Sequence, residues 1–109
     1  MKYVFVCRDG QHRSAIAARK TLDIMSGRYA DLETDYFGVR GNDSNEEKRE
    51  ILNGADFVFV MEENMRFDLR NVLGYKGKLV CLNILNSDDA DDRMVERRLR
   101  EEFEKLGLI

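Results

Sequence analysis

The sequence contains no proline and no tryptophan, and it has one histidine and two cysteines. Its longest apolar run, Phe57 to Met61, is far shorter than the roughly 20 residues that a membrane-spanning helix needs. One histidine and two cysteines are too few soft ligands for a tetrahedral metal site. We therefore expect no metal and no cofactor. Two cysteines, and no basic leader with an apolar stretch before the first strand, favour a cytoplasmic protein that is not attached to a membrane.

Charged residues make up 36% of the chain, yet acidic residues outnumber basic ones and the formal net charge at pH 7 is −3. The sequence has no basic stripe with interleaved aromatic residues, so nucleic acid is not an expected partner. A length of 109 residues and a hydrophobic content of 43% support one core, and we expect a single domain over residues 1–109. An anionic ligand would have to be bound by local geometry rather than by overall charge.

The stretch from Cys7 to Ser14 connects a predicted strand to a predicted helix. Tyr3–Val6 is a β-branched and aromatic run typical of a buried strand, and a helical pattern extends from Ala15 to about Ser26. A short loop of this kind directs backbone N–H groups and a helix N-terminus at one point. The sequence therefore predicts an anion site at this loop.

Cys7 faces that point, where the helix dipole and a guanidinium favour the thiolate, the nucleophilic form of cysteine. Arg13, six residues later, can fold back and hold two phosphate oxygens with its fork of N–H donors. Ser14 can cap the helix or donate its hydroxyl to the thiolate. The same spacing also fits a buried structural cysteine followed by a surface arginine, which is the alternative without chemistry.

The residues between Cys7 and Arg13 are expected to offer backbone N–H groups to the ligand, while most of their side chains point outward. Gly10 allows a positive φ without strain. His12 is not expected to act as a base, because an outward side chain does not reach the phosphorus. The predicted substrate-binding residues are Arg8, Asp9, Gly10, Gln11, His12 and Ser14.

Strand and helix patterns alternate along the chain. The predicted strands are Lys2–Val6, Asp31–Phe37, Phe57–Met61 and Lys78–Ile84. The predicted helices are residues 15–26, a short helix capped by Ser44 and Glu47 that reaches Leu52 or Asn53, one from Glu62 or Glu63 to Gly74, and Asp91–Lys105. This order predicts a three-layer α/β/α domain, with a four-stranded parallel sheet, right-handed crossovers and helices on both faces. Ligands of such sheets bind at the carboxyl ends of the strands, where the loop after strand one lies.

A strand followed by Cys, five residues, Arg-Ser and a helix resembles the signature of the low-molecular-weight protein tyrosine phosphatases, in their short, single-domain prokaryotic form. Glu33–Asp35 with Gly38, and Ala55–Glu62, stand where that family has its second and third strands. The resemblance implies a phosphomonoester hydrolase, a cysteine-dependent protein tyrosine phosphatase that forms a phosphocysteine on Cys7. Its expected partners are a phosphorylated protein or a small aryl phosphate, with inorganic phosphate as product. We expect a monomer or weak dimer.

The Cys7-to-Ser14 loop does not supply the proton donor for the leaving group. The resemblance implies an Asp followed by Pro after the fourth strand, but this chain has no proline. Asp88 is our candidate because it is the first carboxylate after that strand, and Asp89 is the second choice. Asp91 and Asp92 fit the cap of the last helix better than catalysis.

Three alternatives stay open from the residues. The first is a binding module of the same fold that captures phosphate without turnover. The second is a thiol enzyme similar to arsenate reductases, which needs a resolving cysteine; only Cys81 is available, in a run typical of a buried strand, although a Cys7–Cys81 disulfide is conceivable between neighbouring strands. A phosphocysteine carrier of the sugar-transport type is disfavoured by Arg13. Selectivity for phosphotyrosine requires an aromatic wall, for which the candidates are Tyr36, Phe37, Phe67 and Tyr75.

Overall fold

The computed structural model describes residues 1–10, 12–85 and 91–109, in which strands and helices alternate as the sequence predicts. The strands are β1 (Lys2–Cys7), β2 (Glu33–Gly38), β3 (Phe57–Val60) and β4 (Leu79–Cys81). The helices are α1 (Arg13–Ile24), α2 (Asn45–Leu52), the single turn α3 (Met65–Phe67), the π-helical turn η1 (Asp68–Val72) and α4 (Asp92–Lys105).

The four strands form one parallel sheet in the order β2-β1-β3-β4. The central strand β1 is buried from Tyr3 to Cys7, as expected for a strand covered on both faces. β2 lies at one edge, and four of its six residues are only partly buried or exposed. The predicted fold class, a four-stranded parallel α/β sheet, is confirmed.

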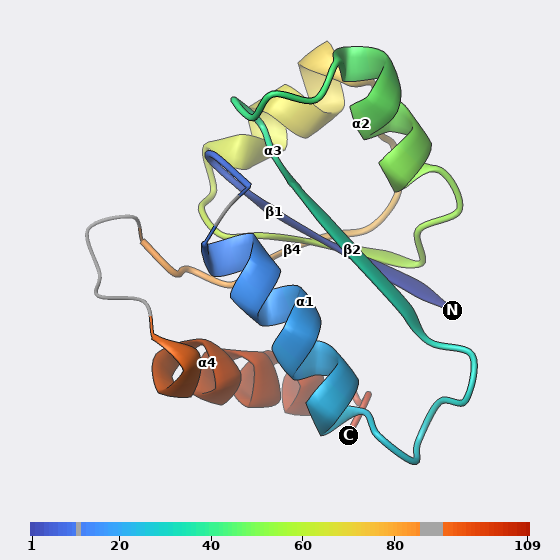
Figure 1. Cartoon of the computed structure of the whole chain (residues 1–109), viewed down its shortest axis with the longest axis vertical. Helices are drawn as coiled ribbons and strands as arrows, with labels where there is room; N and C mark the ends of the chain where they lie inside the picture. Colours follow the sequence, from blue (N-terminus) through green and yellow to red (C-terminus); the bar gives the residue numbers. More distant parts are fainter. Residues whose placement is uncertain (11, 86–90) are drawn as a thin grey trace.

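The helices cover the two faces of the sheet (Figure 1). α1 and α4 pack against each other on one side, and α2 and α3 lie on the other. On the side of α4, Tyr3 of β1 and Phe59 of β3 contact the buried Phe103 at ring-centroid distances of 6.2 and 5.6 Å. These aromatic contacts anchor α4 to the two central strands.

Several element boundaries differ from the sequence expectation. β2 is Glu33–Gly38 rather than Asp31–Phe37, and α1 ends at Ile24 rather than near Ser26. α1 begins at Arg13 rather than Ala15, so that Arg13 and Ser14 belong to its first turn. β4 is shorter than predicted, because only Leu79 to Cys81 pair with β3. The helix predicted after β3 is a single α-helical turn followed by η1, in which Leu73 donates its N–H to the carbonyl of Asp68.

The predicted cap of α2 is confirmed. The N–H of Glu47 donates to Ser44 Oγ at 3.1 Å, and the carboxylate of Glu47 accepts from the Ser44 N–H at 3.5 Å. None of the helices in the described ranges is both long enough and apolar enough to cross a membrane.

Candidate active site

The loop after β1 lies at the carboxyl edge of the sheet, between the neighbouring strands β2 and β3. The chain leaves β1 toward β2 through α1 and returns across β1 to β3, so the sheet order reverses at this loop. Backbone hydrogen bonds hold it on both sides: the Val39 N–H donates to the Cys7 carbonyl at 2.9 Å, and the Met61 N–H donates to the Val6 carbonyl at 3.0 Å. Parallel α/β sheets bind their ligands at such a reversal.

Cys7 is the last residue of β1 and is buried. Its Sγ lies 3.0 Å from Ser14 Oγ, where either atom can donate, and it accepts the N–H of Gly10 at 3.0 Å. The first turn of α1 begins beside this sulfur, so unpaired helix N–H groups and the positive end of the helix dipole are close to it. The Gly10 N–H stabilises negative charge on the sulfur, and the Ser14 hydroxyl does so when it is the donor.

Ser14 performs only one of the two roles that its position suggested. It is fully buried within the first turn of α1, and its hydroxyl contacts the cysteine sulfur rather than capping the helix. The N-cap residue of α1 is His12, which makes no side-chain capping bond. The hydroxyl is therefore available to Cys7.

The loop owes its shape to two glycines that pack backbone against backbone. Gly10 has a φ of +76°, as the sequence predicted for this position. A Cβ on Gly38 would overlap the backbone of Asp9 and Gly10, and a Cβ on Gly10 would overlap the backbone of Gly38. Gly38 is the last residue of β2. The sequence did not indicate that Gly38 contacts the loop, because Gly38 and Gly10 lie far apart in the chain.

Arg13 is almost fully buried, with 4% of its side chain exposed. Its Nη1 donates to Glu62 Oε2 at 2.9 Å and to the carbonyl of Ile84. Within the described part of the chain, both hydrogen bonds of the Arg13 side chain come from Nη1, and none comes from Nε or Nη2. One edge of the guanidinium is therefore fixed, while the other keeps the two donors that suit two phosphate oxygens.

Glu62 is a residue that the sequence analysis missed. It follows β3 at the carboxyl edge of the sheet and is 24% exposed. A carboxylate directly after a central strand was the available signal, because the ends of adjacent parallel strands meet at one edge. The Ile84 N–H donates to the Met61 carbonyl at 2.9 Å, which brings both partners of Arg13 to the same place.

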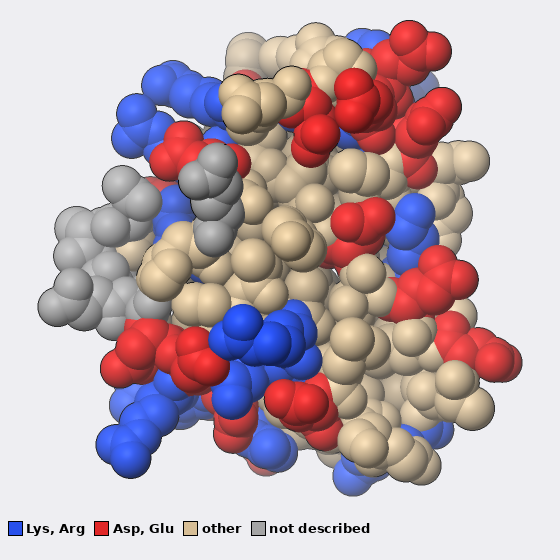
Figure 2. All heavy atoms as spheres, viewed as in Figure 1, with Lys and Arg blue, Asp and Glu red and all other residues tan. Residues whose placement is uncertain are grey.

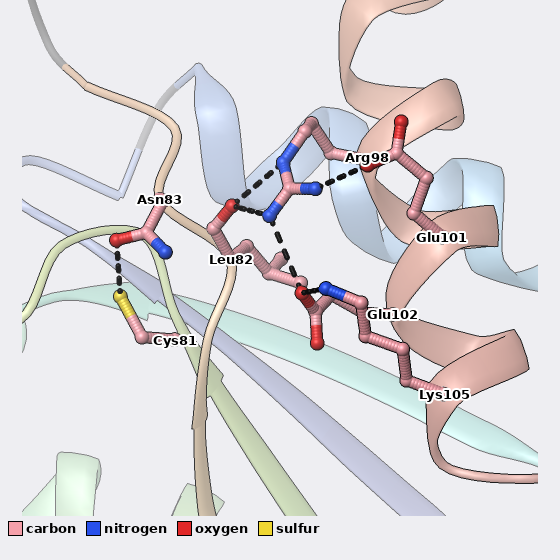
Figure 3. A network of polar contacts seen from close by, with 7 residues as sticks. All are labelled: Cys81, Leu82, Asn83, Arg98, Glu101, Glu102 and Lys105. Atoms are coloured by element: carbon pink, nitrogen blue, oxygen red, sulfur yellow. Dashed lines mark hydrogen bonds and ion pairs between the residues drawn. The ribbon is translucent and has the colours of Figure 1, made fainter.

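A network from α4 fixes the segment after β4 (Figure 3). Arg98 donates from Nε and Nη2 to the Leu82 carbonyl at 3.0 and 2.7 Å, and it also pairs with Glu101 and Glu102 on its own helix. Leu82 is two residues before Ile84, whose carbonyl accepts from Arg13. The network therefore connects α4 to the support of the candidate phosphate-binding arginine.

The other predicted site residues are distributed as follows. Arg8, Asp9 and His12 are exposed, in agreement with side chains that point outward. Gln11, Asp88 and Asp89 lie outside the described residues. Asp91 accepts the Met94 N–H at 2.9 Å as the N-cap of α4, as the sequence predicted.

Cys81 is buried, and its thiol donates to Asn83 Oδ1 at 3.3 Å (Figure 3). Burial raises the pKa of the Cys81 thiol, which disfavours its thiolate. Both cysteines are free, and β3 lies between β1 and β4, so the strands that carry them are not the neighbours that the disulfide alternative required. Two strand spacings amount to about 10 Å, beyond the roughly 7 Å between Cα atoms that a disulfide can bridge.

No described aromatic side chain lines the cavity next to the loop. This cavity of about 240 Å³ is lined by Arg8, Val39, Arg40, Glu62, Asn64, Met65 and Asp68. Among the candidates for an aromatic wall, Phe37 is buried in the core, while Tyr75 lines a separate cavity of about 610 Å³ against α2. The described residues contain no cluster of three or more His, Cys, Asp or Glu side chains that could hold a metal ion.

The chain resembles solved phosphatases over nearly its whole length, although no model of a protein family and no curated protein matches its sequence. A mutant of the YwlE arginine phosphatase with a phosphorylated active-site serine superposes with a TM-score of 0.69 at 18% identity, covering 99% of this chain and 91% of that one. The tyrosine phosphatase Wzb from Escherichia coli K30, in complex with sulphate, gives 0.65 at 16% identity, with coverages of 97% and 98%.

A third relative is the low-molecular-weight protein tyrosine phosphatase from T. tengcongensis, with a TM-score of 0.65, 19% identity and coverages of 93% and 91%. The chain therefore has the fold of the low-molecular-weight protein tyrosine phosphatases, and it carries the Cys7-to-Arg13 loop at the carboxyl end of β1.

Proposed function

We propose that this chain is a phosphomonoester hydrolase of the protein tyrosine phosphatase type, acting through a phosphocysteine on Cys7. The observation that carries the proposal is the arrangement around one sulfur atom. Ser14 Oγ and the Gly10 N–H lie 3.0 Å from Sγ, and Arg13 keeps its Nε and Nη2 donors unengaged by the described residues. A thiolate and a bidentate arginine together suit attack on a phosphate.

In the first step, the Cys7 thiolate attacks phosphorus and forms the S–P bond. The bond from phosphorus to the leaving oxygen breaks, and that oxygen keeps the electron pair and takes a proton from an acid. Arg13 and the loop N–H groups hold the phosphoryl oxygens as charge redistributes over them. The alcohol or phenol then departs.

In the second step, a water molecule attacks phosphorus and loses a proton to a base, while the S–P bond breaks and its electron pair returns to sulfur. The Ser14 hydroxyl donates a hydrogen bond to the reforming thiolate, which makes it a better leaving group. Inorganic phosphate is the product.

The acid of the first step stays a prediction on Asp88, with Asp89 as second choice. If neither carboxylate reaches the leaving oxygen, activated aryl phosphates would still be hydrolysed, because a stable phenolate needs little help to depart, whereas alkyl phosphates would not. Comparing Asp88→Asn with Asp89→Asn on both kinds of substrate separates these cases.

We further propose cytoplasmic action by a monomer or weak dimer on a phosphorylated protein or a small aryl phosphate. The solved relatives include tyrosine phosphatases and an arginine phosphatase, so phosphotyrosine and phosphoarginine peptides belong in one substrate panel. The cavity beside the loop has no described aromatic side chain, which gives a phenyl ring no stacking partner there.

A catalytically silent phosphate-binding module is the alternative that uses the same residues. An enzyme similar to arsenate reductases is disfavoured, because Cys81 is buried and separated from Cys7 by a strand.

The decisive experiment is hydrolysis of p-nitrophenyl phosphate by the wild type, Cys7→Ser and the matched control Cys81→Ala, from acidic to neutral pH. We expect turnover in the wild type and in Cys81→Ala and none in Cys7→Ser. A folded wild type that is stabilised by phosphate or vanadate but shows no turnover would establish the binding module instead.

A further inference from the structure

Two arginines lie next to each other at the edge of the candidate active site. Arg8 follows Cys7 directly, and Arg40 is two residues past the end of β2. The Arg40 N–H donates to the Arg8 carbonyl at 2.8 Å, so a backbone hydrogen bond fixes the two residues side by side. Both side chains are exposed.

Both arginines line the cavity of about 240 Å³ beside the loop. Neither guanidinium has an ion-pair or hydrogen-bond partner within residues 1–10, 12–85 and 91–109. Of the two carboxylates in the lining, Glu62 is already paired with Arg13, which leaves Asp68 alone against the two arginines. The cavity therefore has an excess of positive charge.

This local positive charge is opposite in sign to the net charge of the chain. The chain has a formal net charge of −3, and acidic side chains gather over α2 on the face that Figure 2 shows. Neither guanidinium is paired within the described residues, so a bound anion would compensate the charge of both. The position of the pair next to Cys7 places such an anion beside the phosphate.

We propose that Arg8 and Arg40 form a second anion subsite for a carboxylate or a further phosphate carried one or two residues from the phosphorylated residue of the substrate. This rests on the proposed phosphatase function and specifies its substrate class as acidic phosphopeptides. Adjacent residues of an extended peptide are about 3.3–3.6 Å apart along the chain, so a flanking side chain can enter the neighbouring cavity while the phosphate occupies the loop. Glu62 connects the two places, since it lines the cavity and pairs with Arg13.

The test measures binding of phosphotyrosine peptides to the Cys7→Ser variant by fluorescence anisotropy, so that it does not depend on turnover. Four peptides share one sequence and differ only at the residues flanking the phosphotyrosine, which are alanine, aspartate, a second phosphorylated residue or lysine. The peptides are titrated against Cys7→Ser alone and combined with Arg8→Gln, Arg40→Gln or both. The matched control is Arg28→Gln, an exposed arginine that follows α1 and is not part of the cavity lining.

We expect the aspartate peptide to bind about tenfold more tightly than the alanine peptide, since two exposed charge pairs of modest strength add to roughly that factor. The preference should fall to about threefold in each single variant and disappear in the double variant and at high salt, while Arg28→Gln retains it. An advantage confined to the doubly phosphorylated peptide would assign the subsite to phosphate, and an equal advantage for both anionic peptides would assign it to either group.

Three results would overturn the inference: equal affinity for the alanine peptide and both anionic peptides, preference for lysine, or no binding of any peptide. Its failure is distinguishable from failure of the proposed function. If p-nitrophenyl phosphate is hydrolysed but the flanking preference is absent, the subsite is wrong and the enzyme stands. If the preference is present without turnover, the subsite stands and the chain is a binding module.

Discussion

Replacing Glu62 by glutamine tests whether Arg13 is positioned by its ion pair. Arg13 Nη1 and Glu62 Oε2 are 2.9 Å apart, and the two side chains are 4% and 24% exposed. The substitution removes the negative charge but keeps an oxygen that can accept the same hydrogen bond. It therefore isolates the electrostatic part of the contact.

The expected loss can be bounded from both sides. A hydrogen bond to a charged group contributes about 1.5–3 kcal/mol, and breaking a fully buried ion pair costs about 3–5 kcal/mol. Because Glu62 retains contact with water and glutamine still accepts a hydrogen bond, we expect the free energy of unfolding to fall by about 1–2 kcal/mol. Urea denaturation should resolve this as a lower midpoint with an unchanged slope.

The substitution is also expected to weaken the interaction with phosphate. With Nη1 less firmly held, the Nε and Nη2 edge of Arg13 loses its fixed orientation. We expect kcat/KM for p-nitrophenyl phosphate to fall about tenfold, equivalent to about 1.4 kcal/mol. The thermal stabilisation by inorganic phosphate should shrink in the same variant, since it follows the affinity for the folded state.

Glu63→Gln is the matched control, one residue further along the chain. Glu63 is 62% exposed and pairs with Arg66 on the surface, a contact that also lowers the pKa of its carboxyl. It should leave phosphate binding and kcat/KM unchanged. If Glu62→Gln also leaves both unchanged, or binds phosphate more tightly than the wild type, then Glu62 does not orient Arg13 for the ligand and the reasoning is refuted.

Three further predictions concern the fold around the site. Gly38→Ala should lower the unfolding free energy, measured in urea, by about 3 kcal/mol or more, because a Cβ at position 38 overlaps the backbone of the loop. Gly41→Ala should lower it clearly less, and equal effects would contradict the close contact between Gly38 and Gly10. Burial raises the pKa of Tyr3 to about 12, so the folded state holds the phenol proton between pH 10 and 12 while the unfolded state releases it, and stability falls as pH rises through that window. Tyr3→Phe should weaken this pH dependence. It should also stabilise the protein by about 1 kcal/mol at neutral pH, because the buried Tyr3 hydroxyl has no described hydrogen-bond partner. A destabilised variant would indicate that the hydroxyl has a partner outside the described residues. Asp91→Ala should lower the unfolding free energy by about 1 kcal/mol through loss of the α4 cap, and no change in the urea midpoint would rule out that cap.

The sequence was most informative where function depends on neighbouring residues. Cys7, Gly10, Arg13 and Ser14 belong to one short stretch whose spacing predicted the loop, with the contact between hydroxyl and sulfur as one of two roles for Ser14. The Ser44–Glu47 cap was predicted equally well, because both hydrogen bonds of a capping box form within four consecutive residues. Alternating strand and helix patterns likewise predicted the parallel sheet.

The sequence was least informative where a contact joins segments distant in the chain. Arg13 meets Glu62 and Ile84 across 49 and 71 residues, and nothing in the local pattern of either partner indicates an arginine. The alternative of a Cys7–Cys81 disulfide stayed open in the sequence for the same reason, because the order of parallel strands is set by how the crossovers pack.

By itself, the sequence determined a parallel α/β domain with a cysteine and an arginine on one loop, which we propose binds an anion, because hydrophobic period, turn residues and helix caps act over a few residues. Only the tertiary structure decided that β1 lies between β2 and β3, that Gly38 closes on Gly10, and that Glu62 fixes one edge of Arg13. Those features depend on which strand ends meet when the whole sheet assembles, and that is a property of packing rather than of any one segment.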